Sequence, residues 1–388
     1  MKNNMTERQG IYADHFSCTF KDPNEFLSFL RERKQNSSWM TVPSKNIQFQ
    51  SIEADSPYGN LYMRIYQNNG RAEVLADTQE NTCILLNVNG YDYPVRTCAI
   101  KTILERARIS GHALSKVSTD VFAQILNHCM KVASGDSLVK VADEKVSAVH
   151  GGDAKDYAVL EMLPLFQKVT SYLDDNFPGY QFQTASFDHS LALAIWSLDG
   201  QENQLLDTYQ RELALKGLTG KRVRPGLRFM TSDVGISGAN LYPILLMGNG
   251  SRIIPLGYPI KTEHKSGVDL DFFDEQLDLL YARFKEAIEK QTKLLSIYIS
   301  NPYTTMLGVL KRIGAPKKAS YEAAGQFISQ NGNRVCTAYE LYLAMSEIIF
   351  MAQCDGASAG RIAQVEEIIA RALSINWSEY DRAGDFKW

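Results

Sequence analysis

The chain has 388 residues, which is long for one hydrophobic core and fits two or three modules that share an interface. Hydrophobic residues make up 45% of the chain and charged residues 22%, proportions typical of a soluble globular protein. The net charge of −3 excludes a strong global attraction for polyanions, so any nucleic-acid partner would need a local basic patch.

The sequence shows no clear signal for membrane insertion, secretion or disulfide formation. No apolar run approaches the ~18 residues that a membrane helix needs, and the start MKNNMTERQG lacks the apolar region of a secretion signal. The six cysteines are scattered without a CxxC pair, which is typical of reduced thiols. We therefore expect a cytoplasmic protein with no membrane segment.

Residues 1–96 are predicted to form a β-rich lead-in. An amphipathic helix is expected at 25–33, directly after Asp22-Pro23. Alternating or apolar runs then predict strands at 47–52, 61–66 and 83–88.

Residues 97–143 are predicted to be helical. Apolar residues recur at spacings of three and four on both sides of the break at 109–112. Two short helices with a glycine between them suit either a helix-turn-helix or a helical hairpin on a sheet. Few basic residues lie where a recognition helix would need them, so the hairpin is favoured.

Residues 135–265 are predicted to form a meander of short antiparallel strands. A hairpin is expected at 138–149 and a second antiparallel pair at 182–198, with one helix at 158–173 between them. Further strands are expected at 226–232, 239–247 and 251–260. Strands and helices do not alternate regularly, which favours an antiparallel α+β fold.

An apolar stripe from Leu270 to Tyr298 predicts one long helix behind the sheet, about 45 Å long at 1.5 Å per residue. Helices at 305–312, 321–329, 337–353 and 359–374 are expected to cap the fold. The predicted domains are the lead-in (1–96), an α+β core (97–300) and a helical cap (301–388).

Four blocks, in this order and spacing, carry a family resemblance: AIKTILERARISGHALSKVSTDVFAQILNHCM (99–130), VKVADEKVSAVHGGDAKDYAVLEMLPLF (139–166), RFMTSDVGISGANLYPILL (228–246) and TAYELYLAMSEII (337–349). They resemble the DUF932 family of phage- and plasmid-type proteins over residues 97–380. The family pattern has an arginine in the turn where this chain has His150-Gly151-Gly152-Asp153, and here the next tyrosine is Tyr157. The resemblance implies a mobile-element setting among replication and recombination genes, without a particular mechanism.

Charge segregation is the clearest functional signal. Acidic residues are absent between Glu212 and Asp233, and again between Glu289 and Glu322, whereas basic residues occur in both stretches and tyrosines in the second. Cations that neutralise phosphates, interleaved with rings that stack on bases, are what a groove for single-stranded nucleic acid needs. The predicted phosphate contacts are Lys221, Arg222, Arg224, Arg228, Lys311, Arg312, Lys317 and Lys318, with Tyr303 as a stacking ring.

Other functions have weaker signals. A sheet backed by a long helix is also the general plan of single-strand annealing proteins, so assembly into a homo-oligomer is a further expectation by analogy. The alternative function is a non-enzymatic factor that binds or assembles on a host protein, because apolar helix is abundant relative to charge.

An enzyme is the third and weakest interpretation, because no catalytic motif is evident. The acids at 269–275 suit the start of a helix better than a metal site, and the residues around Lys221 lack phosphate-loop spacing. Glu263 and His264 are candidates for an acid–base pair, although a surface histidine is the simpler interpretation. No catalytic residue, metal ligand or cofactor is therefore predicted.

Overall fold

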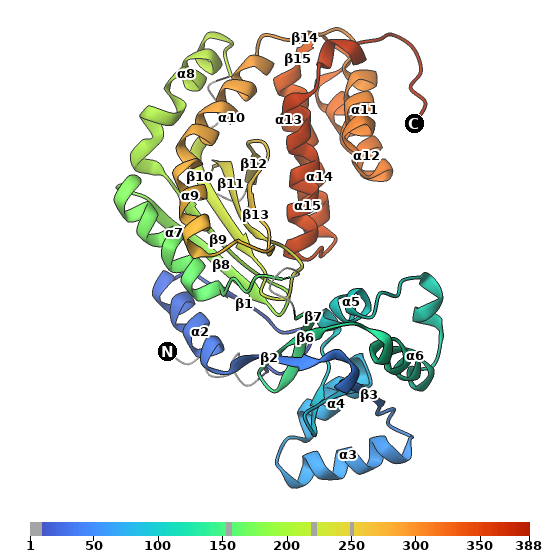
Figure 1. The fold of residues 1–388 in the computed structure, drawn as a ribbon. Coiled ribbons are helices and arrows are strands. Elements are labelled where there is room, and N and C mark those ends of the chain that lie inside the picture. The colour runs from blue at the N-terminus through green and yellow to red at the C-terminus, as the bar shows by residue number, and fades with distance from the viewer. Residues whose placement is uncertain (1–9, 153–156, 219–222, 249–251) are drawn as a thin grey trace.

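The computed structural model describes residues 10–152, 157–218, 223–248 and 252–388. Its main body is built on one antiparallel sheet in which β8 to β12 are neighbours in chain order (Figure 1). This confirms the predicted antiparallel α+β fold. The strands are β1 (Ser17–Phe20), β8 (Gln181–Asp188), β9 (Leu191–Ser197), β10 (Val223–Thr231), β11 (Ala239–Met247), β12 (Arg252–Pro255) and β13 (Ile260–Thr262).

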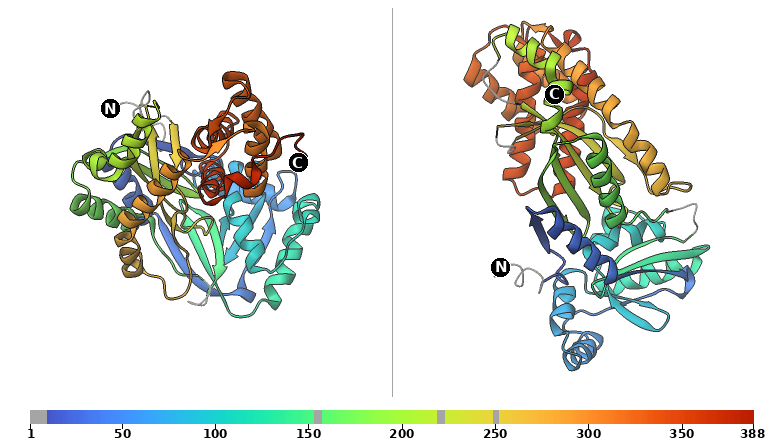
Figure 2. Two further views of the ribbon diagram at one scale, coloured as in Figure 1. Left: turned by 90° about the horizontal axis from the view of Figure 1, so that it is seen from above. Right: turned by 90° about the vertical axis from the view of Figure 1, so that its left-hand side faces the viewer.

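The two central strands, β10 and β11, are covered on both faces. Leu227 of β10 and Leu245 of β11 pack toward α10, while Tyr242 and Ile244 point to the other face and pack with Ala363 of α15. Figure 2 shows helices on either side of this sheet. The helices on the α10 side are α2 (Pro23–Gln35), α7 (Met162–Asn176), α8 (Glu202–Leu215), α9 (Leu270–Asp278) and α10 (Leu280–Leu294).

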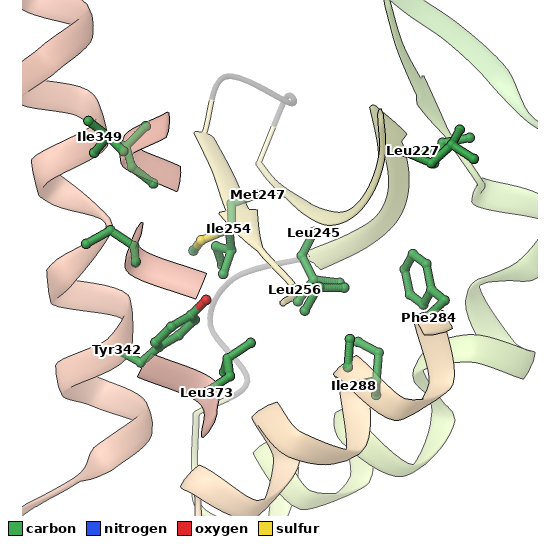
Figure 3. Packing of buried hydrophobic residues seen from close by; sticks show 14 of the residues in the cluster. Leu227, Leu245, Met247, Ile254, Leu256, Phe284, Ile288, Tyr342, Ile349 and Leu373 are labelled. Atoms are coloured by element: carbon green, nitrogen blue, oxygen red, sulfur yellow. The ribbon is translucent and has the colours of Figure 1, made fainter. Parts of the chain in front are cut away.

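The main core lies between α10, the sheet and the C-terminal helices. In Figure 3, Leu245 and Leu256 lie between Phe284 and Ile288 of α10 on one side and Tyr342 on the other. The Tyr342 hydroxyl donates a hydrogen bond of 2.6 Å to the carbonyl of Pro255. This bond gives the buried hydroxyl the partner that it would otherwise lack.

Two consecutive helices, α9 and α10, stand where one long helix is predicted. Asp269 caps α9, because its carboxylate accepts hydrogen bonds from the amides of Asp271 and Phe272. Leu279 separates the two helices, with a ψ of −12° that departs from the usual helical value. The predicted apolar stripe is nevertheless buried along both helices, and Tyr298 belongs to a short strand after them.

A smaller body at one end of the molecule has its own core (Figures 1 and 2). Its sheets are β2-β6-β7 and β3-β4-β5, so β2 pairs with β6 across the predicted boundary at 96/97. The first strand, β1, instead pairs with β8 of the main sheet. The lead-in is therefore not a structural unit by itself. The elements of the small body are β2 (Ser37–Pro43), β3 (Gln48–Ser51), α3 (Pro57–Asn68), α4 (Ala72–Asn81), β4 (Ile84–Val88), β5 (Tyr91–Pro94), α5 (Thr97–Arg106), α6 (Thr119–Val132), β6 (Asp136–Ala142) and β7 (Lys145–Gly151).

Helix α3 replaces the strand predicted at 61–66, so that prediction was wrong. Ser56 caps the helix by accepting a 2.9 Å hydrogen bond from the Gly59 amide, and Pro57 occupies the first helical position. Both features start helices, and they outweigh a short alternation of apolar residues.

Helices α5 and α6 pack on strands, as expected of a helical hairpin. The side chain of Asn127 on α6 exchanges two hydrogen bonds with the backbone of Phe49 on β3, at 2.7 and 2.9 Å. These bonds fix α6 against the small sheet, where its buried face contributes Leu126 and Met130 to the core.

The C-terminal part is helical, as predicted. Thr337 and Glu340 form a reciprocal cap at the start of α13. None of the helices within the described ranges is both long and apolar enough to cross a membrane. The elements are β14 (Tyr298–Ile299), α11 (Pro302–Ile313), α12 (Lys317–Asn331), β15 (Cys336–Thr337), α13 (Ala338–Met345), α14 (Glu347–Cys354) and α15 (Ala359–Ala370).

Candidate nucleic-acid interface

Arg228 lies inside the protein, so its predicted phosphate contact is corrected. Only 2% of the residue is exposed, its guanidinium forms an ion pair with Glu366 of α15, and it lies 4.4 Å from the ring centre of Tyr242. Burial lowers the pKa of Arg228 to about 10. A strand covered on both faces directs this side chain at α15, where no phosphate can reach it.

Arg224 is also held by an internal partner. Its Nη1 lies 3.2 and 3.4 Å from the two carboxylate oxygens of Asp199, and only 16% of its side chain is exposed. A charge that is already neutralised and mostly covered is a poor phosphate contact. Lys221 and Arg222, the other predicted cations of this stretch, lie outside the described residues.

The second basic stretch forms one exposed corner where α11 turns into α12. Gly314 ends α11 with a φ of +83°, a conformation that glycine adopts without strain, and α12 begins after Pro316. Two cations precede this turn and two follow it, so the structure brings them together. The exposed residues of this basic corner are Lys311, Arg312, Lys317 and Lys318.

Aromatic rings connect the two sides of the basic corner. The ring of Tyr321, one turn after Lys317 on α12, lies 5.8 Å from that of Trp388. Trp388 is 6.2 Å from Phe386, and Lys311 Nζ lies 5.7 Å from the Phe386 ring centre. Three half-buried rings therefore lie in a row between Lys317 and Lys311, and none of the three is among the predicted contacts.

The end of the chain forms a strap, residues 379–388, along α11. Asp381 accepts hydrogen bonds of 2.8 Å from the amides of both Ser300 and Asn301. Burial alone would raise the pKa of Asp381, but these bonds outweigh it and lower that pKa. At the other end of the strap, Lys311 Nζ donates a 3.2 Å hydrogen bond to the Lys387 carbonyl.

The strap adds two exposed cations, Arg382 and Lys387, beside α11. The hydroxyl of Thr304 donates a 2.7 Å hydrogen bond to the carbonyl of Arg382, next to the exposed ring of Tyr303. Arg382 is thus fixed at the start of α11 and Lys387 at its end. The predicted stacking residue Tyr303 lies about 12 Å from Lys311 along the helix axis, from the rise per residue.

The two acid-free stretches also meet at the end of α8. Lys216 Nζ donates a 2.7 Å hydrogen bond to the hydroxyl of Tyr298, whose residue is 61% exposed. The neighbouring groove between α8 and α10 has a volume of about 580 Å³, but Glu212 and Glu289 line it beside Lys285 and Lys293. Its mixed charge makes it less suited to phosphates than the basic corner.

The residues considered for catalysis are engaged elsewhere. Glu263 forms an ion pair with Lys265, whereas the His264 ring stacks on Tyr157 at 4.9 Å and donates from Nδ1 to the Ala158 carbonyl. Glu263 and His264 therefore do not form an acid–base pair. Among the described residues, no group of three or more His, Cys, Asp or Glu side chains could hold a metal ion.

A stack of rings occupies the junction between the two bodies. The ring centre of His150 from β7 lies 3.8 Å from that of Tyr157, and the planes of His150 and His264 are each within 4° of the Tyr157 plane. Burial and, to a lesser extent, the positive charge of His264 lower the pKa of His150 to about 4. Asp233, beside the stack, forms a buried ion pair with Lys140. The stack therefore joins the bodies through neutral rings.

Comparisons with known proteins add no assignment. No protein-family model matches the chain, and neither a curated protein nor a solved structure matches it. The resemblance to the DUF932 family stays a prediction from the four sequence blocks.

Proposed function

We propose that this protein binds single-stranded nucleic acid at the basic corner and strap, and serves replication or recombination in a mobile element. The observation that carries the proposal is the row of three half-buried rings, Tyr321, Trp388 and Phe386, between the exposed cations Lys317 and Lys311. The mobile-element setting rests on the family resemblance alone.

The chemistry of the face favours a strand over a simple anion. Cations that contact phosphates release condensed counterions, which makes affinity fall steeply with salt. Rings such as Phe386 and Trp388 can stack on bases, a contribution of about 1–3 kcal/mol per base. Bases in a duplex are already stacked and paired, so this second contribution applies only to a single strand.

A charge-reversal pair tests the proposal. Lys318 and Lys101 are a matched pair of exposed lysines. Lys318 Nζ lies 3.8 Å from Oε1 of Glu322 one turn later on α12, and Lys101 Nζ lies 3.7 Å from Oε1 of Glu105 at the same spacing on α5 of the small body. Lys317→Glu with Lys318→Glu should weaken binding of a labelled oligonucleotide and reduce the slope of log affinity against log salt by about 2. Lys101→Glu with Arg64→Glu reverses two exposed charges elsewhere and should leave both values unchanged.

Two results would contradict the proposal. One is an absence of binding by the unmodified protein at low salt, and the other is equal binding by the two charge-reversed variants. Sedimentation with and without the oligonucleotide also tests the expected homo-oligomer, which should grow when the strand is added.

One observation favours the alternative, a factor that binds a host protein. Helix α3 exposes Tyr58, Leu61 and Ile65 by 54%, 52% and 41%, at spacings of three and four residues, so they form one apolar stripe. Such a stripe suits a protein partner. A partner retained by the unmodified protein and by the Lys317→Glu, Lys318→Glu variant, but lost with Leu61→Asp, would support this function over nucleic-acid binding.

A further inference from the structure

The strap arches over α11 and leaves a pocket beneath it. Asp381 and the Arg382 carbonyl anchor its start, and Lys311 anchors the Lys387 carbonyl near its end. Between these anchors Ala383, Gly384 and Asp385 are exposed. The pocket has a volume of about 440 Å³, within the range of about 300–1,000 Å³ that small-molecule sites occupy.

Gly308 of α11 shapes the floor of this pocket. A Cβ atom at this position would lie 2.8 Å from Cδ1 of Tyr380, so the missing side chain lets the start of the strap approach the helix. Thr304, one turn earlier on α11, also lines the pocket and holds the strap through the Arg382 carbonyl. The cavity is thus bounded by a rigid helix on one side and an anchored chain on the other.

The lining combines three chemical types. Tyr380 and Phe386 are aromatic, Arg382 and Lys387 are cationic, and the carboxylates of Glu379 and Asp385 are acceptors. A simple anion would not require the rings, and an apolar ligand would not require the charges. A nucleotide uses all three, because its base is flat, its phosphate is anionic and its amino or imino groups are donors.

We propose that this pocket holds one nucleotide of the bound strand, an inference that rests on the proposed function. The base enters beneath the strap, and Lys311, Arg382 and Lys387 contact the adjoining phosphates. A base in a duplex cannot enter without leaving its stack. The pocket therefore makes the interface selective for single strands, whereas the basic corner alone would bind either form.

Filling the pocket tests this inference. Ala383→Trp places a ring at an exposed position in its lining, and Ala54→Trp does the same in an exposed loop of the small body. By fluorescence anisotropy, Ala383→Trp should weaken binding of an oligothymidylate about tenfold while leaving duplex binding unchanged. Ala54→Trp should change neither, and adenosine monophosphate should displace the strand from the unmodified protein.

A second variant guards against a folding defect in the first. Phe386→Leu keeps an apolar side chain at this position of the strap but removes the ring, and it should also weaken single-strand binding about tenfold. Unfolding midpoints of both variants establish that the fold is intact.

The outcomes separate the pocket from the proposed function. Equal weakening of single-strand and duplex binding overturns the pocket, as does unchanged affinity in both variants together with no displacement by the mononucleotide. In either case, salt-dependent strand binding by the unmodified protein leaves the proposed function standing. If the unmodified protein binds no strand, the proposed function fails and the pocket inference fails with it.

Discussion

The ion pair between Arg228 and Glu366 gives the sharpest prediction, because a substitution there distinguishes a structural role of Arg228 from a role in ligand binding. Both side chains are at most 3% exposed, and the pair joins β10 to α15. Arg228→Met would keep an apolar chain near the Tyr242 ring but leave the Glu366 carboxylate buried without its partner. Removing one member of a buried pair is expected to cost about 3–5 kcal/mol, a large part of a typical stability of about 5–15 kcal/mol.

Urea unfolding measures this loss, and a second substitution isolates its cause. Arg228→Met combined with Glu366→Leu removes both charges, so it should recover most of the lost free energy of unfolding. Oligonucleotide binding by the folded fraction of Arg228→Met should match that of the unmodified protein, because the guanidinium does not reach the surface. A single variant with unchanged stability and weakened binding would refute this reasoning and restore Arg228 as a phosphate contact.

Two further predictions concern the junction and the strap. His150 has a pKa of about 4 in the folded protein, below its ordinary value of 6.5, so the unfolded chain binds its proton first as pH falls. Stability should drop by about 3 kcal/mol between pH 7 and pH 4 from this group, and urea unfolding of His150→Phe should show a shallower pH dependence. Asp381→Ala should free the start of the strap and speed tryptic cleavage at Arg382 severalfold, while the cleavage rate at Arg64 stays unchanged; equal rates at Arg382 would exclude the anchor.

Local signals predicted much of the fold. The alternation in 182–198 and the turn within 138–149 identified the pairs β8–β9 and β6–β7, because neighbouring strands in sequence need only a short connection. Helix caps such as Asp269 also act within one turn. A local signal also spoke against the strand wrongly expected at 61–66, because Ser56-Pro57 marks the start of a helix.

Local sequence signals could not predict the pairing of strands that lie far apart in the sequence. β1 (Ser17–Phe20) joins β8 (Gln181–Asp188). β2 joins β6, so the predicted boundary at 96/97 falls inside the small body. No periodicity within either segment specifies its partner strand. Composition alone could place a boundary only where the pattern changed from strand to helix.

Burial of the central strands explains why Arg228 has a structural role. β11 is a nine-residue strand that is buried throughout, and its apolar sequence is typical of a strand covered on both faces. A charged residue on a strand beside it must then find an internal partner. Applied to β10, this reasoning could have marked Arg228 as structural, although it would not have identified Glu366, which lies far along the chain.

The same burial explains why the remaining candidate interface lies on the cap. Helices cover both faces of the central strands, which leaves little open sheet for a strand of nucleic acid to follow. The turn between α11 and α12 faces outward, and the strap supplies the rings and two more cations from residues close in sequence to one another. Stability and binding should therefore separate cleanly: Arg228→Met should impair only folding, and Lys317→Glu with Lys318→Glu only binding.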